Sequence, residues 1–378
     1  MLKRDFLKGL ASGLLFLSTP AAHAATRALP ASHNKNVVWI MLRGAMDSLH
    51  VVVPKFDKHL QNHRAALIKP IIDTLNPLDR GFGLHPSLET LYGWYQEKSL
   101  LPVVAVASPS RSRSHFFSQD LLESGNDQVD YQSGWLARAL AQKQMQGLAF
   151  AHALPISMRG NQTVKAWYPS SLPSVDEDIY SQLMHLYDQH PQLQAQLQRG
   201  LEINQTMGEK NNLKRAPFNQ LCRICGETLA TTDTQAAMLE FGGWDTHNNQ
   251  IPRLNRQLQQ LDKGLQQLKV SLATQWQNTL VIIATEFGRT VKVNGTQGTD
   301  HGTASALFLA GGAVKGGSVM GEWPGLADHQ LYKQRDLMPT SDIRSWIGAA
   351  LQQHWSLNDA QMANVFPAVS VQKRSLIG

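Results

Sequence analysis

Five continuous runs of apolar residues constrain the fold of this 378-residue chain more than any other feature. They occupy residues 36–42, 101–108, 235–243, 279–285 and 305–312. Strands that are buried on both faces have such unbroken apolar sequences, whereas half-exposed strands alternate apolar and polar residues. Segments with helical spacing occur between the runs, at 85–100 and 251–272, and "DLMPTSDIRSWIGAALQQHW" predicts another helix near the C-terminus. The alternation predicts an α/β domain with a mostly parallel sheet that helices cover on both faces.

Residues 1–24 have the pattern of a signal peptide. Lys3, Arg4 and Lys8 precede a short apolar run, and "AHA" then forms a small-residue cleavage site that ends at Ala24. "KRDFLKG" resembles the twin-arginine export signal, although Lys3 replaces its first arginine, so ordinary Sec export stays an alternative. We therefore expect a periplasmic or secreted protein that keeps no transmembrane span after cleavage.

Residues 170–232 interrupt the alternation of strands and helices, because they are Gln-rich and contain no strong strand. We predict a helical insertion or cap there, within a single domain that covers residues 25–378. Cys222 and Cys225 lie in this segment, on one apolar face of an expected helix. Their spacing favours two small core residues, with a disulfide as the alternative, because no second C-x-x-C completes a zinc site.

The charge distribution argues against nucleic-acid binding. The formal net charge is +6, but part of it belongs to the basic start of the chain. No cluster of Lys and Arg with interleaved aromatic residues occurs, which is the usual footprint of a nucleic-acid interface. The basic balance permits an anionic small-molecule or glycan substrate. The sequence does not indicate an oligomeric state.

Carboxylates and imidazoles follow most of the apolar runs. In an open parallel sheet, functional groups collect beyond the carboxyl ends of the strands. Unpaired acids in such a cleft are costly, so they are expected to be paired or bound to cations. The candidate metal ligands are Asp47, Asp245, His247, Glu286, Asp300 and His301. This donor set suits zinc, with manganese or calcium as alternatives, at one or two ions.

The pair in "WDTHNN" is the most informative of these candidates. In extended backbone, Asp245 and His247 point to the same side, while Trp244 and Thr246 point away from it. Each candidate also has a structural interpretation. Asp47 suits a turn or cap, Glu286 could pair with Arg289, and the Asp245 segment could only cap the 251–272 helix. Their joint position at one sheet edge favours a metal site, in which Asp300 could serve only to orient His301.

Several motifs together resemble a bacterial family of exported proteins, catalogued as unknown-function family 1501. They are "RGAMDSL", "RSHFFSQDLLESG", "GGWDTHNNQ", "TEFGRT", "GTDHGTASALFLAGGAVKGG" and "DLMPTSDIR", in this order. The family is grouped with the alkaline-phosphatase and sulfatase superfamily. The resemblance implies a three-layer α/β/α sandwich, with Asp47 as the first-strand metal carboxylate, Asp245 and His247 as the central pair, and His301 as a late histidine.

The sequence departs from the superfamily at two positions. Phe287 stands where a second metal ligand often follows, which puts a two-metal site in doubt. "ASPSR" resembles the sulfatase signature, but Ala107 occupies the position of the nucleophile, which excludes formylglycine chemistry. Ser114 is the replacement candidate, because a serine at a helix N-terminus lies among free N–H groups. Arg111 and Arg113 are the candidates for holding a sulfate or phosphate group, with Arg111 assigned to the transferred group, and His115 or His301 for moving a proton.

These features predict an exported, metal-dependent hydrolase of phosphate or sulfate esters. A non-catalytic metal-containing binding protein on the same fold is the alternative, which Ala107 and Phe287 favour. A purely structural exported protein is the third interpretation. The discriminating feature is a nucleophile within reach of a bound metal ion.

Overall fold

The five apolar runs form the centre of an eight-stranded sheet with the order β11-β5-β10-β9-β1-β8-β6-β7. The computed structural model describes residues 35–161, 163–169 and 216–378, together with scattered residues between 184 and 198. Residues Lys35–Gly378 form one compact unit. The strands are β1 (Asn36–Arg43), β5 (Leu100–Ala107), β6 (Gln146–Phe150), β7 (Val164–Ala166), β8 (Thr234–Gly242), β9 (Thr279–Thr285), β10 (Ser305–Ala310) and β11 (Ser341–Asp342). The predicted mostly parallel α/β sheet is thereby confirmed.

The strand β10 is the exception to the parallel arrangement. It runs antiparallel to both of its neighbours, β5 and β9, while the other pairs in this sheet are parallel. An antiparallel strand starts at the edge where its parallel neighbours end. The loop before β10 therefore reaches the same sheet edge as the loops that follow β1, β5, β8 and β9.

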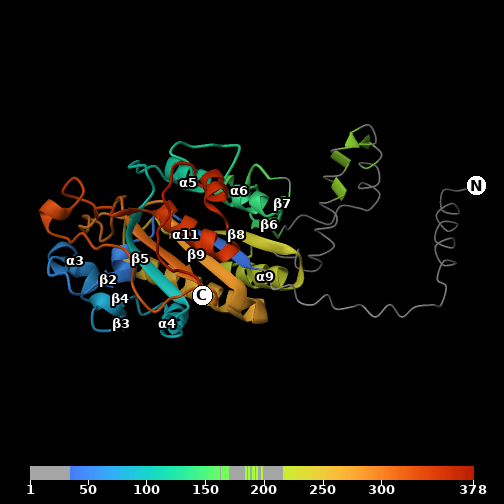
Figure 1. Ribbon diagram of the computed structural model, residues 1–378. Coiled ribbons are helices and arrows are strands. Elements are labelled where there is room, and N and C mark those ends of the chain that lie inside the picture. The colour runs from blue at the N-terminus through green and yellow to red at the C-terminus, as the bar shows by residue number, and fades with distance from the viewer. Residues whose placement is uncertain are drawn as a thin grey trace, which may run out of the picture. The chain divides into compact units, whose positions relative to one another are not determined.

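Helices cover both faces of the sheet. Along β1, Val38, Ile40 and Leu42 pack into one apolar core, and Val37, Trp39 and Met41 pack into the other. The first core includes residues of α4 (Glu89–Gln96), α9 (Phe218–Thr231) and α10 (Gln250–Leu272). The second includes residues of α5 (His115–Ser124), α6 (Trp135–Gln142), α11 (Ile343–Trp355) and α12 (Asp359–Val365). Figure 1 shows α5 and α6 on one side of the sheet, and α4 and α9 on the other.

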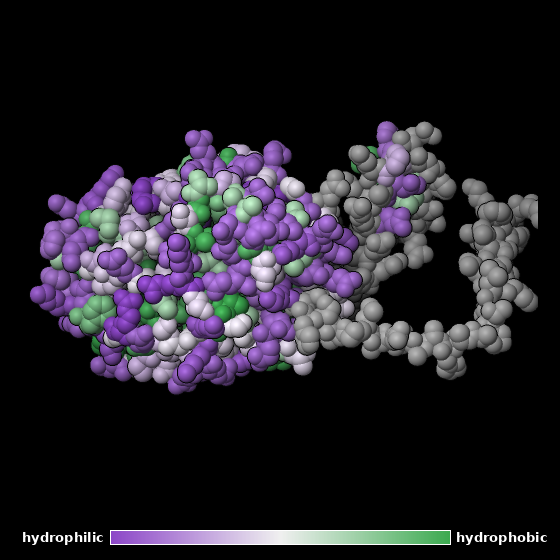
Figure 2. All heavy atoms as spheres, in the orientation of Figure 1, coloured by the Kyte–Doolittle hydropathy of each residue, from purple (hydrophilic) through white to green (hydrophobic). Residues whose placement is uncertain are grey.

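Shorter elements complete the described part of the chain. A small antiparallel sheet joins β2, β4 and β3 beside the main one. These elements are α2 (Ser48–Val51), β2 (Val52–Pro54), α3 (Leu60–Ile68), β3 (Asn76–Pro77), η2 (Asp79–Gly81), β4 (Phe82–Leu84), η3 (Ile156–Met158), η5 (Ala273–Asn278) and η6 (Asp328–Gln330). The surface in Figure 2 is mostly hydrophilic, with apolar residues in separate small patches.

The domain predictions fall partly outside the described residues. The expected signal peptide, residues 1–24, lies entirely outside them. Most of the expected insertion, 170–232, also lies outside, but its last part forms α9, which packs against α10 and the sheet. This last part is a sheet-covering helix instead of a cap. In the described part of the chain, no helix combines the length and apolar character needed to cross a membrane.

Candidate metal centre

Three loops meet at the carboxyl edge of the sheet and place a group of histidines there. His115 starts α5 after β5, and Asp245 and His247 follow β8. Asp300 and His301 precede β10, whose antiparallel direction brings them to this edge. We call His115, Asp245, His247 and His301 the histidine cluster.

Gly44 allows the loops after β1 and β8 to approach closely. Its φ is +118°, and a Cβ atom there would lie 2.6 Å from the backbone nitrogen of Asp245. The Gly44 N–H donates to Oε1 of Glu286 at 2.8 Å. A larger residue would therefore push apart the two loops and also strain the backbone.

The Nε2 atoms of the three histidines point at one another and at Asp245. His301 Nε2 lies 2.9 Å from Nε2 of His115 and 2.9 Å from Nε2 of His247. Asp245 Oδ1 lies 3.0 Å from His247 Nε2 and 3.2 Å from His301 Nε2, and its Oδ2 lies 3.5 Å from His115 Nε2. Ligand atoms of His115, Asp245 and His301 all lie within 4.8 Å of one another.

The other ring nitrogen of each histidine faces an oxygen acceptor. His115 Nδ1 lies 2.6 Å from Oε1 of Glu286, and His247 Nδ1 lies 3.1 Å from Oδ1 of Asp300. His301 Nδ1 lies 2.9 Å from the Arg113 carbonyl oxygen. A carbonyl or carboxylate only accepts, so each Nδ1 can donate to the oxygen that it faces, and a neutral imidazole with its proton there leaves Nε2 unprotonated. Three unprotonated Nε2 atoms then converge on the Asp245 carboxylate.

This donor set fits a divalent cation. Converging lone pairs repel one another unless a cation or a proton lies among them. Ligands about 2.1 Å from a tetrahedral zinc ion are about 3.4 Å apart, which is close to the contacts of 2.9–3.5 Å among His115, Asp245 and His301. His247 contacts Asp245 and His301 but is not part of this three-residue set. Imidazoles held by carboxylate or carbonyl acceptors are also the usual ligands of zinc. Nitrogen donors favour zinc over calcium, which prefers oxygen.

The charge around the histidine cluster also favours a divalent cation. Asp245, Glu286 and Asp300 bring three negative charges, and Arg289 binds Asp245 Oδ1 at 2.6 Å with one positive charge. Three minus one leaves two negative charges among these directly bonded groups. A divalent cation would cancel them.

The pKa values of the cluster follow the same contacts. The hydrogen bond that His115 donates to Glu286 raises the pKa of His115, although burial opposes it. Burial and the neighbouring His115 lower the pKa of His301. Burial alone would raise the pKa of Asp245, but the hydrogen bond and charge of Arg289 outweigh it and lower that pKa. The Asn294 side chain contributes most to the lowered pKa of Asp300.

Asp47 does not join the histidine cluster. Arg64 donates to Oδ1 at 3.1 Å and to Oδ2 at 3.0 Å, and Gln250 Nε2 donates to Oδ2 at 2.6 Å. Arg64 and Asp47 are both almost fully buried. The charge and hydrogen bonds of Arg64 hold the pKa of Asp47 below its ordinary value, against the effect of burial. Since the protein itself neutralises this carboxylate, we remove Asp47 from the candidate ligands.

Three other predicted residues have contacts that differ from the expected ones. Glu286 bonds to His115 Nδ1, the Gly44 N–H and the Thr285 hydroxyl, so both of its oxygens have partners within the protein. Asp300 orients His247, not His301. Arg111 Nη1 donates to carbonyl oxygens of its own turn, from Ser108 to Ser110.

Ser114 is the N-cap residue of α5 and immediately precedes His115. Its side chain is exposed and makes no capping hydrogen bond. Its backbone N–H donates to the Ser112 hydroxyl at 3.2 Å. His115, predicted as a proton carrier, instead lies among the candidate ligands.

The segment around Asp245 does not act as a helix cap. The N-cap of α10 is Asn249, four residues beyond Asp245. Trp244 is fully buried and donates from its indole N–H to the Phe241 carbonyl, as expected for a side chain that points away from the cluster. Thr246 is also buried, and its hydroxyl donates to Gln250.

Sequence reasoning missed several supporting residues. Buried Arg289 binds Asp245 instead of Glu286, and also binds Thr299. Arg113, which presents its carbonyl to His301, is anchored through its guanidinium to Asp336. Arg113 was predicted only as a partner for a sulfate or phosphate group, and no sequence signal pointed to Asp336.

Phe287, which stands where another ligand was expected, is buried and stacks on His115. Their ring centroids are 5.0 Å apart, and Phe287 also lies 5.2 Å from His301. It thus forms an apolar wall for two imidazoles. Ala107 ends β5, where it pairs with Asp342 of β11.

Similar solved structures belong to the alkaline-phosphatase and sulfatase superfamily. A protein of the alkaline phosphatase superfamily from Vibrio parahaemolyticus has 10% identity and a TM-score of 0.38, over 85% of this chain and 66% of that chain. A 2-O GAG sulfatase has 10% identity and a TM-score of 0.43, over 90% and 76%. An alkaline phosphatase from the Antarctic bacterium TAB5 has 12% identity and a TM-score of 0.39, over 76% and 95%. At such TM-scores, the likeness says nothing about the site.

No curated protein matches the sequence. The family model for the protein of unknown function DUF1501 matches residues 86–368. This match spans well over half of the chain and contains the histidine cluster. It agrees with the resemblance that the sequence motifs carry. The chain therefore belongs to the DUF1501 family.

Proposed function

We propose that this protein is a metal-dependent hydrolase of phosphate or sulfate esters. The observation that carries the proposal is the convergence of three Nε2 atoms and one carboxylate, with every Nδ1 atom held by an oxygen acceptor. In such a site, the Nε2 atoms and the carboxylate bring free electron pairs together, and neither a neutral imidazole nor an ionised carboxylate carries a positive charge. It is suited to a cation, and a cation near a cleft is suited to an anionic ester.

In this proposal, the histidine cluster holds the cation, with zinc favoured over manganese or calcium. When bound, the cation would polarise the ester oxygen and lower the pKa of water. Glu286, Asp300 and the Arg113 carbonyl fix the three rings. Arg289 keeps Asp245 ionised and therefore able to bind a cation at neutral pH.

The nucleophile is either Ser114 or a water molecule. The side chain of Ser114 is exposed and lies next to His115 in the sequence, which favours Ser114 as the nucleophile. The substrate's anionic group needs a cationic partner. Arg43 suits this better than Arg111, because it lines one cleft with His115 and Asp245, whereas Arg111 binds its own turn.

The test combines metal analysis with hydrolysis of aryl phosphates, phosphodiesters and sulfates. Zinc-loaded protein should hydrolyse one of these classes, and Asp245→Asn and His247→Ala should both lose metal and activity. Ser114→Ala should abolish activity if Ser114 is the nucleophile, and retain it if water is. Bound metal with no hydrolysis of any ester would favour the non-catalytic binding protein. Retained metal in both ligand variants would exclude the metal site itself.

Export is a separate proposal that rests on residues 1–24. We infer cleavage after Ala24 and a periplasmic or secreted location, by twin-arginine or Sec export. The basic start and the "AHA" site support this. N-terminal sequencing of the exported protein should begin at Ala25. A protein that stays in the cytoplasm with Met1 intact would contradict it.

A further inference from the structure

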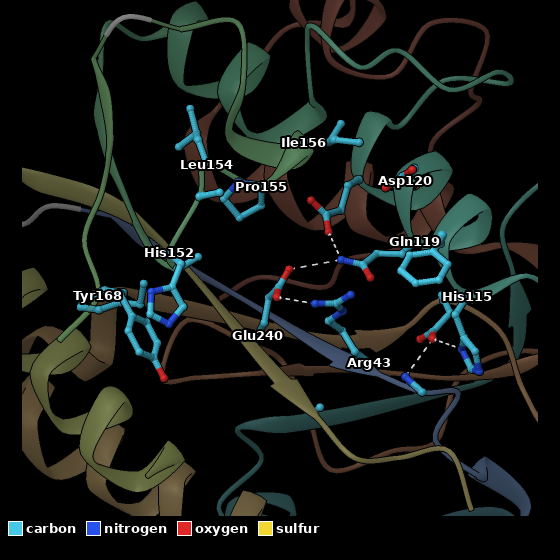
Figure 3. A pocket seen from close by; sticks show the side chains of 18 of the residues that line it. Arg43, His115, Gln119, Asp120, His152, Leu154, Pro155, Ile156, Tyr168 and Glu240 are labelled. Carbon is cyan, nitrogen blue, oxygen red and sulfur yellow. Dashed lines mark hydrogen bonds and ion pairs between the residues drawn. The ribbon is translucent and has the colours of Figure 1, made fainter. Parts of the chain in front are cut away.

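A deep cleft extends from the histidine cluster across the end of the sheet. Its volume is about 970 Å³, at the upper end of the range for small-molecule sites. His115 lies at one end, and His152 and Tyr168 lie at the other, with Arg43 and Glu240 between them (Figure 3). An isolated phosphate or sulfate group would fill only a small part of this volume.

Donors and acceptors alternate along the wall of the cleft. Arg43 Nη1 donates to Glu240 Oε2 at 3.0 Å, and Gln119 Nε2 donates to Glu240 Oε1 at 3.2 Å. Gln119 Nε2 also donates to Glu123 at 2.7 Å (Figure 3). Hydroxyl groups both donate and accept, so they match a wall that offers both kinds of partner.

The cleft is not suited to a second anionic group. Apart from the histidine cluster and Glu286, its ionisable lining includes the acids Asp120, Glu123 and Glu240, and two arginines. Arg159 uses its guanidinium to bind the carbonyls of Leu154 and Tyr131. This leaves Arg43, which pairs with Glu240 and interacts with the charge of Asp120, as the cation that could bind a second anionic group, and this disfavours a polyanion. The presence of Arg43 in the middle also disfavours a cationic head group.

Aromatic rings border the same cleft. The rings of His152 and Tyr168 have centroids 4.0 Å apart. Phe116 is 76% exposed and Tyr131 is 54% exposed, although both are large rings that line the cleft. Exposed rings beside polar groups suit a ligand with one apolar face and hydroxyls at its edge.

We propose that the cleft binds an uncharged sugar unit, which is the alcohol part of the anionic ester. This inference rests on the proposed function for the position of the ester group. The sugar's hydroxyls bond to Arg43, Glu240 and Gln119, and its apolar face packs on the Phe116 or Tyr168 ring. The subsite thus favours glycosyl esters over small alkyl, cationic or multiply charged ones.

The test is calorimetric binding to the zinc-loaded chain. Its probes are inorganic phosphate, glucose 6-phosphate, phosphocholine and glucose 1,6-bisphosphate. Glucose 6-phosphate should bind about tenfold more tightly than inorganic phosphate, because its sugar contacts the cleft and inorganic phosphate has no such contacts. Phosphocholine and the bisphosphate should both bind more weakly than glucose 6-phosphate.

Variants assign the preference to the cleft. At least one of Phe116→Ala and Tyr168→Ala should reduce the affinity ratio of glucose 6-phosphate to inorganic phosphate several-fold. Tyr168→Phe keeps the ring and should keep the ratio. Phe117→Ala is the matched control, because Phe117 is 43% exposed but does not line the cleft.

Three outcomes would overturn the inference. The first is an affinity ratio of glucose 6-phosphate to inorganic phosphate near one, or no binding of either probe. The second is tighter binding of phosphocholine or the bisphosphate than of glucose 6-phosphate. The third is an affinity ratio that Phe116→Ala and Tyr168→Ala both leave unchanged. A preserved ratio without hydrolysis of any ester would refute the proposed hydrolase activity alone. Binding and turnover therefore test the two proposals separately.

Discussion

Two clusters of polar side chains lie at the carboxyl edge of the main sheet, and each contains an aspartate bound to a buried arginine. One is the Asp47 cluster, which we define as Asp47, Arg64 and Gln250. The other is the histidine cluster, whose Asp245 binds Arg289. In the first, the carboxylate receives three hydrogen bonds from side-chain donors. In the second, the carboxylate faces three ring nitrogens that carry no proton in the neutral state.

The difference teaches that a carboxylate's role depends on the counter-charge that the fold supplies. Arg64 is fully buried and forms two parallel bonds to Asp47, which is the strongest geometry for such a pair. No charge is left for a cation to balance there. Asp245 is half-exposed, and the carboxylates of Glu286 and Asp300 lie behind its neighbouring imidazoles. A cation completes this second arrangement, whereas it would disrupt the first.

The largest expected effect comes from breaking the Asp47 cluster. Arg64→Met leaves Asp47 buried without its partner and should lower the free energy of unfolding by about 3–5 kcal/mol. Urea denaturation measures the loss. Arg64→Met combined with Asp47→Asn should recover a large part of it, because no uncompensated charge remains. If the single variant unfolds at the same urea concentration as the unchanged chain, the Asp47 cluster is not the structural ion pair described above.

The histidine cluster should respond in the opposite way. His247→Ala removes a proposed ligand and should weaken zinc binding more than about 100-fold, the upper range for loss of an orienting residue. When a chelator has removed the metal, the free energy of unfolding of the variant should lie within about 1 kcal/mol of that of the unchanged chain, because the His247 side chain is partly exposed. Competition titration with a zinc indicator measures affinity, and His152→Ala provides a control outside the cluster. Equal affinity in all three chains would rule out His247 as a ligand.

The sequence was sufficient to predict the sheet, because each of its five longest strands is predominantly apolar, although Glu240 interrupts the run in β8. The direction of β10 was not predictable, since "SALFLAGG" has the same pattern as the parallel strands. The loop before β10 was nevertheless assigned to the correct edge, and His301 lies there because that strand is antiparallel. The small strands β6, β7 and β11 lack a long apolar run and were missed.

The same strand-end signal gave different results for Asp245 and Asp47. Both follow a buried strand, but α3 brings Arg64 onto Asp47, and nothing in local sequence shows that contact. His115 also follows a buried strand. It was predicted as a proton carrier and not as a ligand. The sequence does not show its distance from the other histidines, because that distance depends on how α5 begins. Tertiary contacts with buried arginines and carboxylates decide whether such a residue is a candidate ligand or part of a structural ion pair. The spacing of residues along the sequence does not encode these contacts.

Removing an orienting carboxylate should have a smaller effect than removing a ligand. Asp300→Ala leaves His247 Nδ1 without its acceptor and should weaken zinc binding about 10–100-fold. Glu97→Ala is the control, because it removes an exposed carboxylate that pairs with Lys269 away from the cluster. The zinc titration used for His247→Ala measures both. An Asp300→Ala affinity equal to that of Glu97→Ala would mean that Asp300 does not orient a ligand.

The last comparison is between the histidine cluster and a histidine that has no carboxylate partner. His354 is buried in α11, and its Nε2 lies 2.9 Å from the Asn36 carbonyl. Burial lowers its pKa to about 4, whereas the hydrogen bond to Glu286 raises the pKa of His115. Between the folded pKa and the ordinary value of 6.5, the unfolded chain binds more protons at His354.

Stability from His354 is therefore complete above about pH 6.5 and falls as the pH drops toward 4, by up to about 1.4 kcal/mol per pH unit. His354→Phe costs stability at neutral pH through the lost hydrogen bond, but it should flatten this slope. Urea denaturation of both chains between pH 7 and 4.5 gives the difference in slope. Other titrating groups, including the histidine cluster, occur in both chains and cancel in that difference. Parallel curves would mean that His354 is protonated equally in the folded and unfolded states, and that burial without a carboxylate does not lower its pKa.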